Sequence, residues 1–339
     1  MSLPSVAGSR SPKPPGRLLL PALLVLALAP AAARAQEALG LVPPEAASVG
    51  VVRLDELRSS PLAAKLLADT DRMTGQGDAA RFMEEAGLRP KEDVDTVVVA
   101  AMPREGSRRN EDALVLFEGR FDPVRLGSAI TARGATLHRS PNGDYFLLPD
   151  KSERGDPGAV AFASSRLVIA GTENQVTAAL ANRQRRGGSG FLRGEGLGRH
   201  VSRLPGDSSV WVLVDAKRFP IARRHAADER SGDPSQALVG AMKSVSLFAF
   251  AAKAQSDGLE LMATGLSEDA ETRELLEDAL RGVLAMWRMA AQEKSPELVT
   301  VLRRFEVERD REGVTVTGTL PGSVIRDLTE RRHARRQSP

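Results

Sequence analysis

SVGVVRLD (residues 48–55) and SSVWVLVD (residues 208–215) are the two stretches that decide the fold of this chain. Each is rich in the β-branched residues that favour strands, and each ends on an aspartate. The same succession follows both stretches: a helix, a strand pair, a helix, a strand pair and a helix. The sequence therefore predicts an α+β unit that occurs twice in tandem.

Tight turns connect most of the expected strands. Asn142-Gly143 lies between strands predicted at 136–140 and 145–148, and Gln255-Ser256-Asp257-Gly258 is another turn signal. Apolar and polar residues alternate along most of these strands, as is typical of antiparallel sheets. We expect an α+β class with two tandem similar units, each an antiparallel sheet with helices packed on one face.

Helices are expected where apolar residues recur at helical spacing. One helix is predicted over 55–71, and another begins at Asp122-Pro123 and ends at Gly134, where a left-handed residue closes a helix. The longest is predicted over 268–292 with Ser267 as its N-cap.

Changes in composition divide the chain. Gly- and Arg-rich segments indicate linkers, and periodic apolar segments indicate folded units. The predicted parts are a signal peptide at 1–35, a linker at 36–47, a first α+β unit at 48–182, a Gly/Arg-rich linker and short helix at 183–204, a second unit at 205–330 and a basic tail at 331–339.

The N-terminal segment is typical of a secretory signal. A basic region precedes the apolar run 18–29, and Ala33-Arg34-Ala35 offers small residues for cleavage before Gln36. As a helix the apolar run would span about 18 Å, against a hydrocarbon core of about 30 Å. We expect cleavage and a periplasmic or secreted protein, and the alternative is a short anchor that stays attached.

Charge and composition exclude several classes of function. Residues 1–35 hold four Arg and Lys and no acid, so their removal changes the formal net charge from +3 to −1. A near-neutral chain with 4% aromatic residues gives no reason to expect a nucleic-acid partner. The chain has no cysteine, which excludes disulfides, thiolate metal sites and a cysteine nucleophile.

Three segments carry a resemblance to a known group of proteins. They are LVPPEAASVGVV (41–52), FEGRFDP (117–123) and PGDSSVW (205–211). With them the chain resembles a family of uncharacterised exported bacterial proteins built from a duplicated α+β unit. The resemblance implies export and duplication, and it supplies neither an activity nor site residues.

Candidate metal, nucleotide and nucleophile sites are weak. His225 and Glu229 are four residues apart, but a catalytic zinc needs three protein ligands and the neighbouring residues are cationic. The glycines of 187–198 lack the spacing of a dinucleotide fingerprint, and Ser189 lies in Gly-Gly-Ser-Gly instead of a nucleophile elbow. We expect no metal and no cofactor.

Two charged groups remain as candidates. The carboxylates Glu84-Glu85 and Asp93 with Asp95 offer possible acid pairs, and surface charge is the ordinary interpretation of both. The basic tail offers a contact for an anionic envelope partner. Its arginines are Arg331, Arg332, Arg335 and Arg336.

The sequence thus favours a non-enzymatic exported protein that acts as a binding or interaction scaffold in the cell envelope. Its partner would be an unknown envelope protein, with at most peripheral membrane contact. One alternative is a carrier of an apolar ligand, with Met286, Trp287 and Met289 lining the pocket. Another is a hydrolase whose serine, histidine and acid come together only in the folded chain.

Overall fold

The computed structural model describes residues 35–60, 78–103, 111–149, 157–185, 190–218, 244–294 and 296–326. The predicted signal peptide before residue 35 and the basic tail therefore lie outside the described residues. No helix within these ranges is long and apolar enough to cross a membrane.

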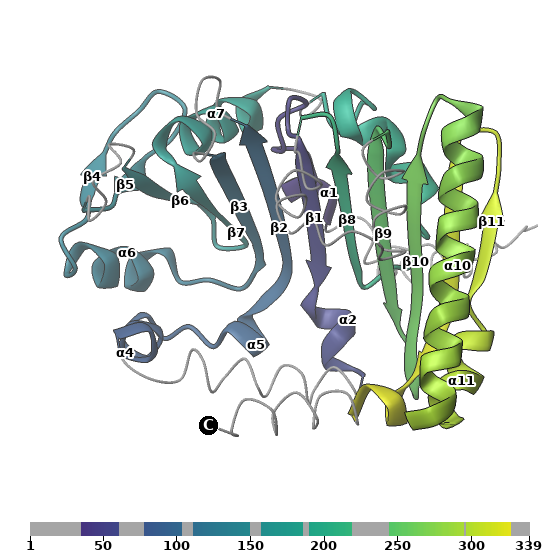
Figure 1. Cartoon of the computed structure of the whole chain (residues 1–339). Coiled ribbons are helices and arrows are strands. Elements are labelled where there is room, and N and C mark those ends of the chain that lie inside the picture. Colours follow the sequence, from purple (N-terminus) through teal and green to yellow (C-terminus); the bar gives the residue numbers. More distant parts are fainter. Residues whose placement is uncertain are drawn as a thin grey trace, which may run out of the picture.

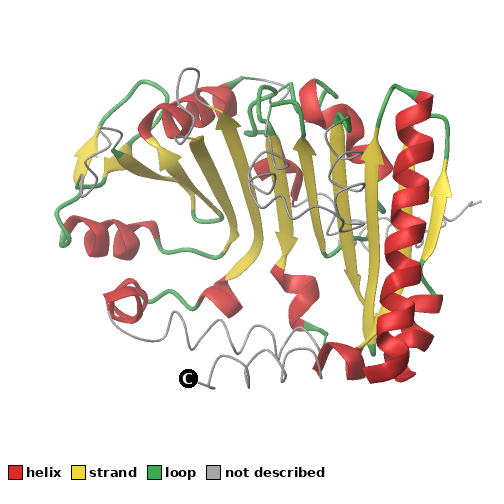
Figure 2. Ribbon diagram, in the orientation of Figure 1, coloured by secondary structure: helices red, strands yellow, loops and turns green. Residues whose placement is uncertain are grey.

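One antiparallel sheet organises the described chain (Figure 2). Its strand order is β11-β12-β10-β9-β8-β1-β2-β3-β7-β6-β5-β4. The α+β class expected from the sequence is confirmed. The strands are β1 (Ser48–Arg53), β2 (Val94–Pro103), β3 (Glu111–Gly119), β4 (Thr136–His138), β5 (Tyr145–Leu147), β6 (Gly158–Ser164), β7 (Leu167–Thr172), β8 (Val210–Asp215), β9 (Leu247–Ala254), β10 (Gly258–Leu266), β11 (Glu306–Arg309) and β12 (Gly313–Pro321).

The two stretches quoted first, now β1 and β8, pair with each other at the centre of the sheet. Val51 lies opposite Trp211, and Ser48 lies opposite Val214. If β1 and β8 were the edge strands of two separate sheets, each would leave a row of unpaired backbone groups. Because they pair with each other, the two expected sheets form one. Outward from this pair the order is β1-β2-β3-β7 on one side and β8-β9-β10-β12 on the other. Internal duplication itself stays a prediction.

Helices contact both faces of the sheet. Leu247 shares a core cluster with Leu197 of η2, whereas the next residue, Phe248, packs with Leu276 of α10. Figure 1 shows α10 in front of the sheet. Since successive strand residues point to opposite faces, α10 and η2 lie on opposite sides. The helices are α1 (Ala35–Leu39), α2 (Leu54–Arg58), α4 (Asp78–Ala86), α5 (Pro90–Asp93), α6 (Pro123–Thr131), α7 (Glu173–Gln184), the 3-10 helix η2 (Gly196–Arg203), α10 (Ala270–Lys294) and α11 (Pro296–Arg303).

Helix capping follows the sequence signals with one correction. The Asp122 carboxylate accepts hydrogen bonds from two backbone N–H groups at the start of α6, as predicted. At α10 the cap is Asp269 and not Ser267: the Asp269 carboxylate accepts from the backbone N–H of Thr272 at 2.7 Å. An acidic side chain there also faces the positive end of the helix dipole. Of the helix expected over 55–71, α2 is described, and 61–71 lie outside the described residues.

The two segments expected to be linkers pack into the core instead. Ala38 and Val42, within 36–47, are fully buried, and Phe191, within 183–204, is 2% exposed. A Cβ on Gly198 would lie 1.9 Å from the carbonyl oxygen of Phe191. A Cβ on Gly196 would lie 2.0 Å from a backbone oxygen of the earlier segment. These glycines permit close approach of two backbones, and the sequence signal was mistaken for flexibility.

Candidate functional site: an apolar groove under the long helix

Apolar side chains form a continuous row across the face of the sheet on which α10 lies. Val212 of β8 is opposite Phe250 of β9, which is opposite Ala263 of β10, which is opposite Val316 of β12. A parallel row consists of Val214, Phe248, Gly265 and Val314. The antiparallel register thus places two apolar rows side by side on four adjacent strands.

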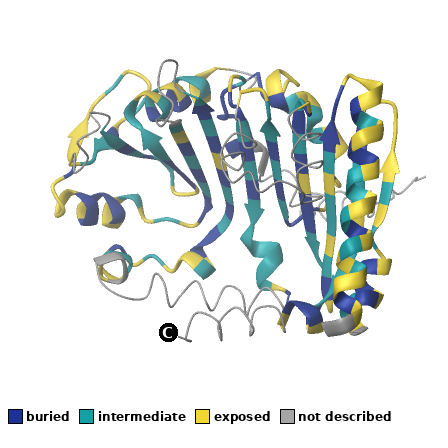
Figure 3. Ribbon diagram, viewed as in Figure 1, coloured by how far each residue is buried: buried dark blue, intermediate teal, exposed yellow. Residues whose placement is uncertain are grey.

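Helix α10 covers part of these rows and leaves a groove. Leu276 and Leu280 form its helical wall, and the enclosed volume is about 270 Å³. Gly265 allows the helix to approach, because a Cβ there would lie 3.0 Å from Leu276 Cδ2. In Figure 3, α10 carries buried and exposed residues on different sides, consistent with one side lying against the sheet.

The described lining of the groove is almost free of polar groups. Thr264 is its one polar residue, but Thr264 lies between Ala263 and Gly265, so its side chain points to the opposite face of the sheet, where its hydroxyl lies 3.0 Å from the Thr315 hydroxyl. Glu277 of α10 is held elsewhere, in ion pairs with Arg281 and Arg309. With no titratable side chain among the described lining residues, the groove offers burial of apolar surface and no means of charge recognition.

The apolar strip continues beyond the groove toward the centre of the sheet. Val212 is paired with Gly50 of β1, and Gly50 is paired with Val99 of β2. Val99 is 44% exposed and Phe250 is 40% exposed. Large apolar side chains gathered on one exposed surface are typical of a ligand or interaction site.

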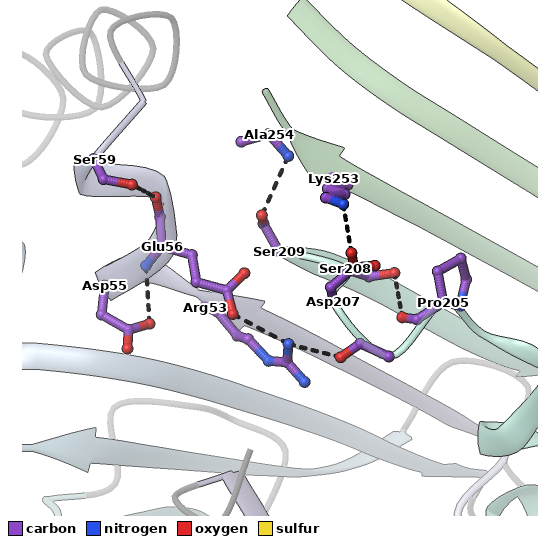
Figure 4. A network of polar contacts seen from close by, with 11 residues as sticks. Arg53, Asp55, Glu56, Ser59, Pro205, Asp207, Ser208, Ser209, Lys253 and Ala254 are labelled. Atoms are coloured by element: carbon purple, nitrogen blue, oxygen red, sulfur yellow. Dashed lines mark hydrogen bonds and ion pairs between the residues drawn. The ribbon is translucent and has the colours of Figure 1, made fainter. Parts of the chain in front are cut away.

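A polar network at the junction of β1 and β8 has a structural role (Figure 4). Arg53 donates to Glu56 Oε1 and to the carbonyl oxygen of Gly206, both at 3.2 Å. Lys253 donates to the Asp207 carboxylate, and this hydrogen bond lowers the pKa of Asp207. Each charged pair lies within one half of the chain, and the bond from Arg53 to the Gly206 carbonyl oxygen connects the two halves. The charged groups that form these pairs thus satisfy one another.

The pocket residues proposed from the sequence do not line this groove. Trp287 is 57% exposed and Met289 is 62% exposed, and neither they nor Met286 belong to the lining. Trp287 is on the same side of α10 as Leu280 but seven residues later, about 10 Å farther along the helix axis. The structure thus has a groove between sheet and helix, but the three residues expected from the sequence do not line it.

Three of the four carboxylates singled out as possible acid pairs, Glu85, Asp93 and Asp95, are engaged in separate ion pairs. Glu85 pairs with Arg133, and Asp95 pairs with Arg58 at 3.0 Å. Asp93 accepts a hydrogen bond from the backbone of the segment before α5. No cluster of three or more metal-ligating side chains occurs in the ranges that the structure describes.

The remaining candidates lie outside the described residues. These are His225 and Glu229, Ser189, and the tail arginines Arg331, Arg332, Arg335 and Arg336. Phe250, Ala263 and Gly265 were not singled out from the sequence. Their strands and the turn that joins them were predicted, but where α10 leaves this hairpin uncovered depends on tertiary packing.

Known proteins give little further guidance. No protein-family model matches the chain, and no curated protein sequence does. Crystal form III of TP0453 is similar in structure, with 10% identity and a TM-score of 0.49 over 85% of this chain and 95% of that chain. Crystal form IV gives 10% identity and a TM-score of 0.46 over 86% and 95%. The family resemblance inferred from the sequence stays a prediction.

Proposed function

We propose that this chain is a non-catalytic binding protein of the cell envelope that holds a small neutral apolar ligand between its sheet and α10. The observation that carries the proposal is the groove of about 270 Å³ lined by Val, Phe, Ala and Leu side chains. The envelope location rests on the predicted signal peptide. The ligand class rests on the side chains that face the groove, which are apolar.

Energetics favour a ligand of modest size. Burial of each methylene group contributes about 0.8 kcal/mol, so a short alkyl chain or one aromatic ring gains several kcal/mol on entering the groove. The volume is close to the lower end of ligand pockets, about 300 Å³. The exposed strip that ends at Val99 would contact any part of the ligand that extends beyond α10.

Filling the groove tests the proposal. Ala263 is exposed and lies between Phe250 and Val316, so Ala263→Trp places an indole where the ligand would bind. The neutral dye N-phenyl-1-naphthylamine should become fluorescent on binding to the unmodified protein, and decanol should displace it. We expect Ala263→Trp to weaken dye binding at least about tenfold, equivalent to about 1.4 kcal/mol.

A matched control separates occupation of the groove from a general effect of added tryptophan. Ala290→Trp adds the same side chain on an exposed position of α10 that is not part of the groove, and it should bind the dye like the unmodified protein. Equal dye binding by the Ala263→Trp variant would refute the assignment of the ligand to this groove. An interaction scaffold without ligand, the leading expectation from the sequence, would bind neither dye nor decanol.

A further inference from the structure

A second cleft, of about 550 Å³, lies near the end of the sheet where β8 ends and β9 begins. Its apolar lining includes Leu197, Leu247 and Leu266, which are buried in the main core. Leu247 and Leu266 point to the face opposite α10, because Phe248 and Gly265, their neighbours, contact the helix side. The cleft is therefore separated from the apolar groove by the sheet itself.

Cationic side chains from three separate segments converge on this cleft. They are Arg199 of η2, Lys217 and Arg218 after β8, and Arg311 in the β11–β12 turn. None of the four takes part in a recorded ion pair with another described residue. Four cations gathered without carboxylate partners create a positive potential that a bound anion would relieve.

The acids around the cleft neutralise this charge only in part. Glu312 forms an ion pair with Arg203. The Asp215 carboxylate accepts hydrogen bonds from the backbone N–H groups of Lys217 and Arg218, at 3.0 and 3.1 Å. Glu268 is exposed at the edge. When the Arg203–Glu312 pair is set aside, the lining of the cleft has four cationic side chains and two carboxylates, Asp215 and Glu268.

Two of the cationic segments are held in place before any ligand binds. Asp215 fixes the turn after β8, as described above. Asp310 fixes the β11–β12 turn, because its carboxylate accepts from the backbone N–H groups of Glu312 and Gly313 at 2.7 and 2.8 Å. Because the backbone of these turns is already fixed, ligand binding needs to order only the cationic side chains.

The serine and histidine side chains in the cleft are not arranged as the catalytic groups of a hydrolase. Ser246 and Ser267 donate their hydroxyls to backbone carbonyls, and His200 Nε2 accepts from Arg199 Nε. Within the described chain neither serine is bonded to His200, so the three groups do not form a catalytic triad. Burial, followed by the charges of Arg199 and Arg203, lowers the pKa of His200, consistent with a positive field.

We propose that this cleft binds a small amphiphilic anion, a phosphate ester whose apolar part lies on the leucine side chains. A phosphate monoester carries about −1.5 to −2 charges at pH 7, which matches the excess of two cations. Its three oxygens suit guanidinium groups, which donate paired hydrogen bonds. The ester is either a free metabolite or the headgroup of an anionic lipid, and both present the same chemistry.

Calorimetric titration of the full chain with n-hexyl phosphate tests this site. We expect saturable binding that is at least about tenfold tighter than that of inorganic phosphate, because the hexyl chain loses contact with water when it enters the cleft. The double variant Arg218→Ala/Arg311→Ala should bind hexyl phosphate at least about tenfold more weakly. Both side chains are exposed, so the variant should keep its fold, as thermal unfolding can verify.

Controls distinguish the site from general electrostatics and from the groove. Arg139→Ala removes an exposed arginine between β4 and β5 and should leave the affinity unchanged, as should Ala263→Trp. Vesicles of phosphatidylcholine with phosphatidic acid separate the two sources: binding lost in the double variant identifies a lipid headgroup, and binding of hexyl phosphate alone identifies a free ester. Absent binding of hexyl phosphate, or equal binding by the double variant, would overturn the proposal.

Discussion

Gly198→Ala is expected to destabilise the protein by about 3 kcal/mol, an effect in the range of overpacked core substitutions. The new Cβ would lie 1.9 Å from the carbonyl oxygen of Phe191, so one of the two backbones must move. Phe191 is part of the main core, and its displacement would disturb the contact with η2. Urea unfolding measures the change, with fluorescence of Trp211, 4% exposed, as the signal.

Gly206→Ala is the matched control for this prediction. A Cβ on Gly206 would have no heavy atom within 4 Å, and Gly206 also lies in a loop between η2 and β8. We expect its stability to change by less than about 0.5 kcal/mol, or to rise slightly because the unfolded chain loses freedom. Equal stability of the two variants would show that 183–204 is the flexible linker that its composition indicates.

Glu118→Gln is expected to stabilise the protein at pH 8 and to have little effect at pH 4. Burial raises the pKa of Glu118 from 4.5 to about 7, and the nearby Glu37 carboxylate adds to this rise. The Ala38 N–H, which donates to Glu118 Oε1 at 2.7 Å, and the Arg166 charge oppose it. Oε2 is buried without a hydrogen-bond partner, so the ionised form is poorly solvated.

The direction of the pH dependence follows from the raised pKa. Between pH 4.5 and 7 the folded state binds a proton that the unfolded state has released, so this group stabilises the fold at low pH and ceases to do so as the pH rises through 7. Glutamine cannot ionise and should recover about 1–3 kcal/mol at pH 8. Urea unfolding at pH 4, 6 and 8 measures the difference.

The control for the glutamate variant is Glu45→Gln, which changes an exposed glutamate in the segment before β1. Its free energy of unfolding should follow that of the unmodified protein at all three pH values. If the stability difference between Glu118→Gln and the unmodified protein did not grow from pH 4 to pH 8, burial of an ionised Glu118 would not be the cause.

Local signals in the sequence predicted most of the individual elements. The Asn142-Gly143 turn lies between β4 and β5 as expected, and Asp122 caps α6. Such signals act between residues close in sequence, so a single chain is enough to recognise them. Local signals were not enough for the Gly/Arg-rich segment, which they indicated to be a flexible linker. Gly196 must be small because it lies against the backbone of Pro44, a residue far earlier in the chain.

The candidate site was predictable in kind but not in position. Apolar alternation in the strands that became β9 and β10 indicated a buried face, and the long amphipathic helix indicated what covers it. Which side chains line the groove depends on how α10 packs: Leu276 and Leu280 line the groove, whereas Leu284 packs against α11 and Trp287 is exposed. The charged cleft gave no signal at all, because its cations come from three separate segments.

By itself the sequence determined the α+β class, the antiparallel strands, the Asp122 cap of α6 and the turns, since each depends on propensity and on neighbours within a few residues. Only the tertiary structure decided that β1 and β8 pair, that helices cover both faces, and where the groove and the cleft lie. The physical reason is that the pairing of β1 with β8 and the packing of helices on the sheet depend on contacts between segments far apart in sequence; Val51 and Trp211, for example, lie more than a hundred residues apart.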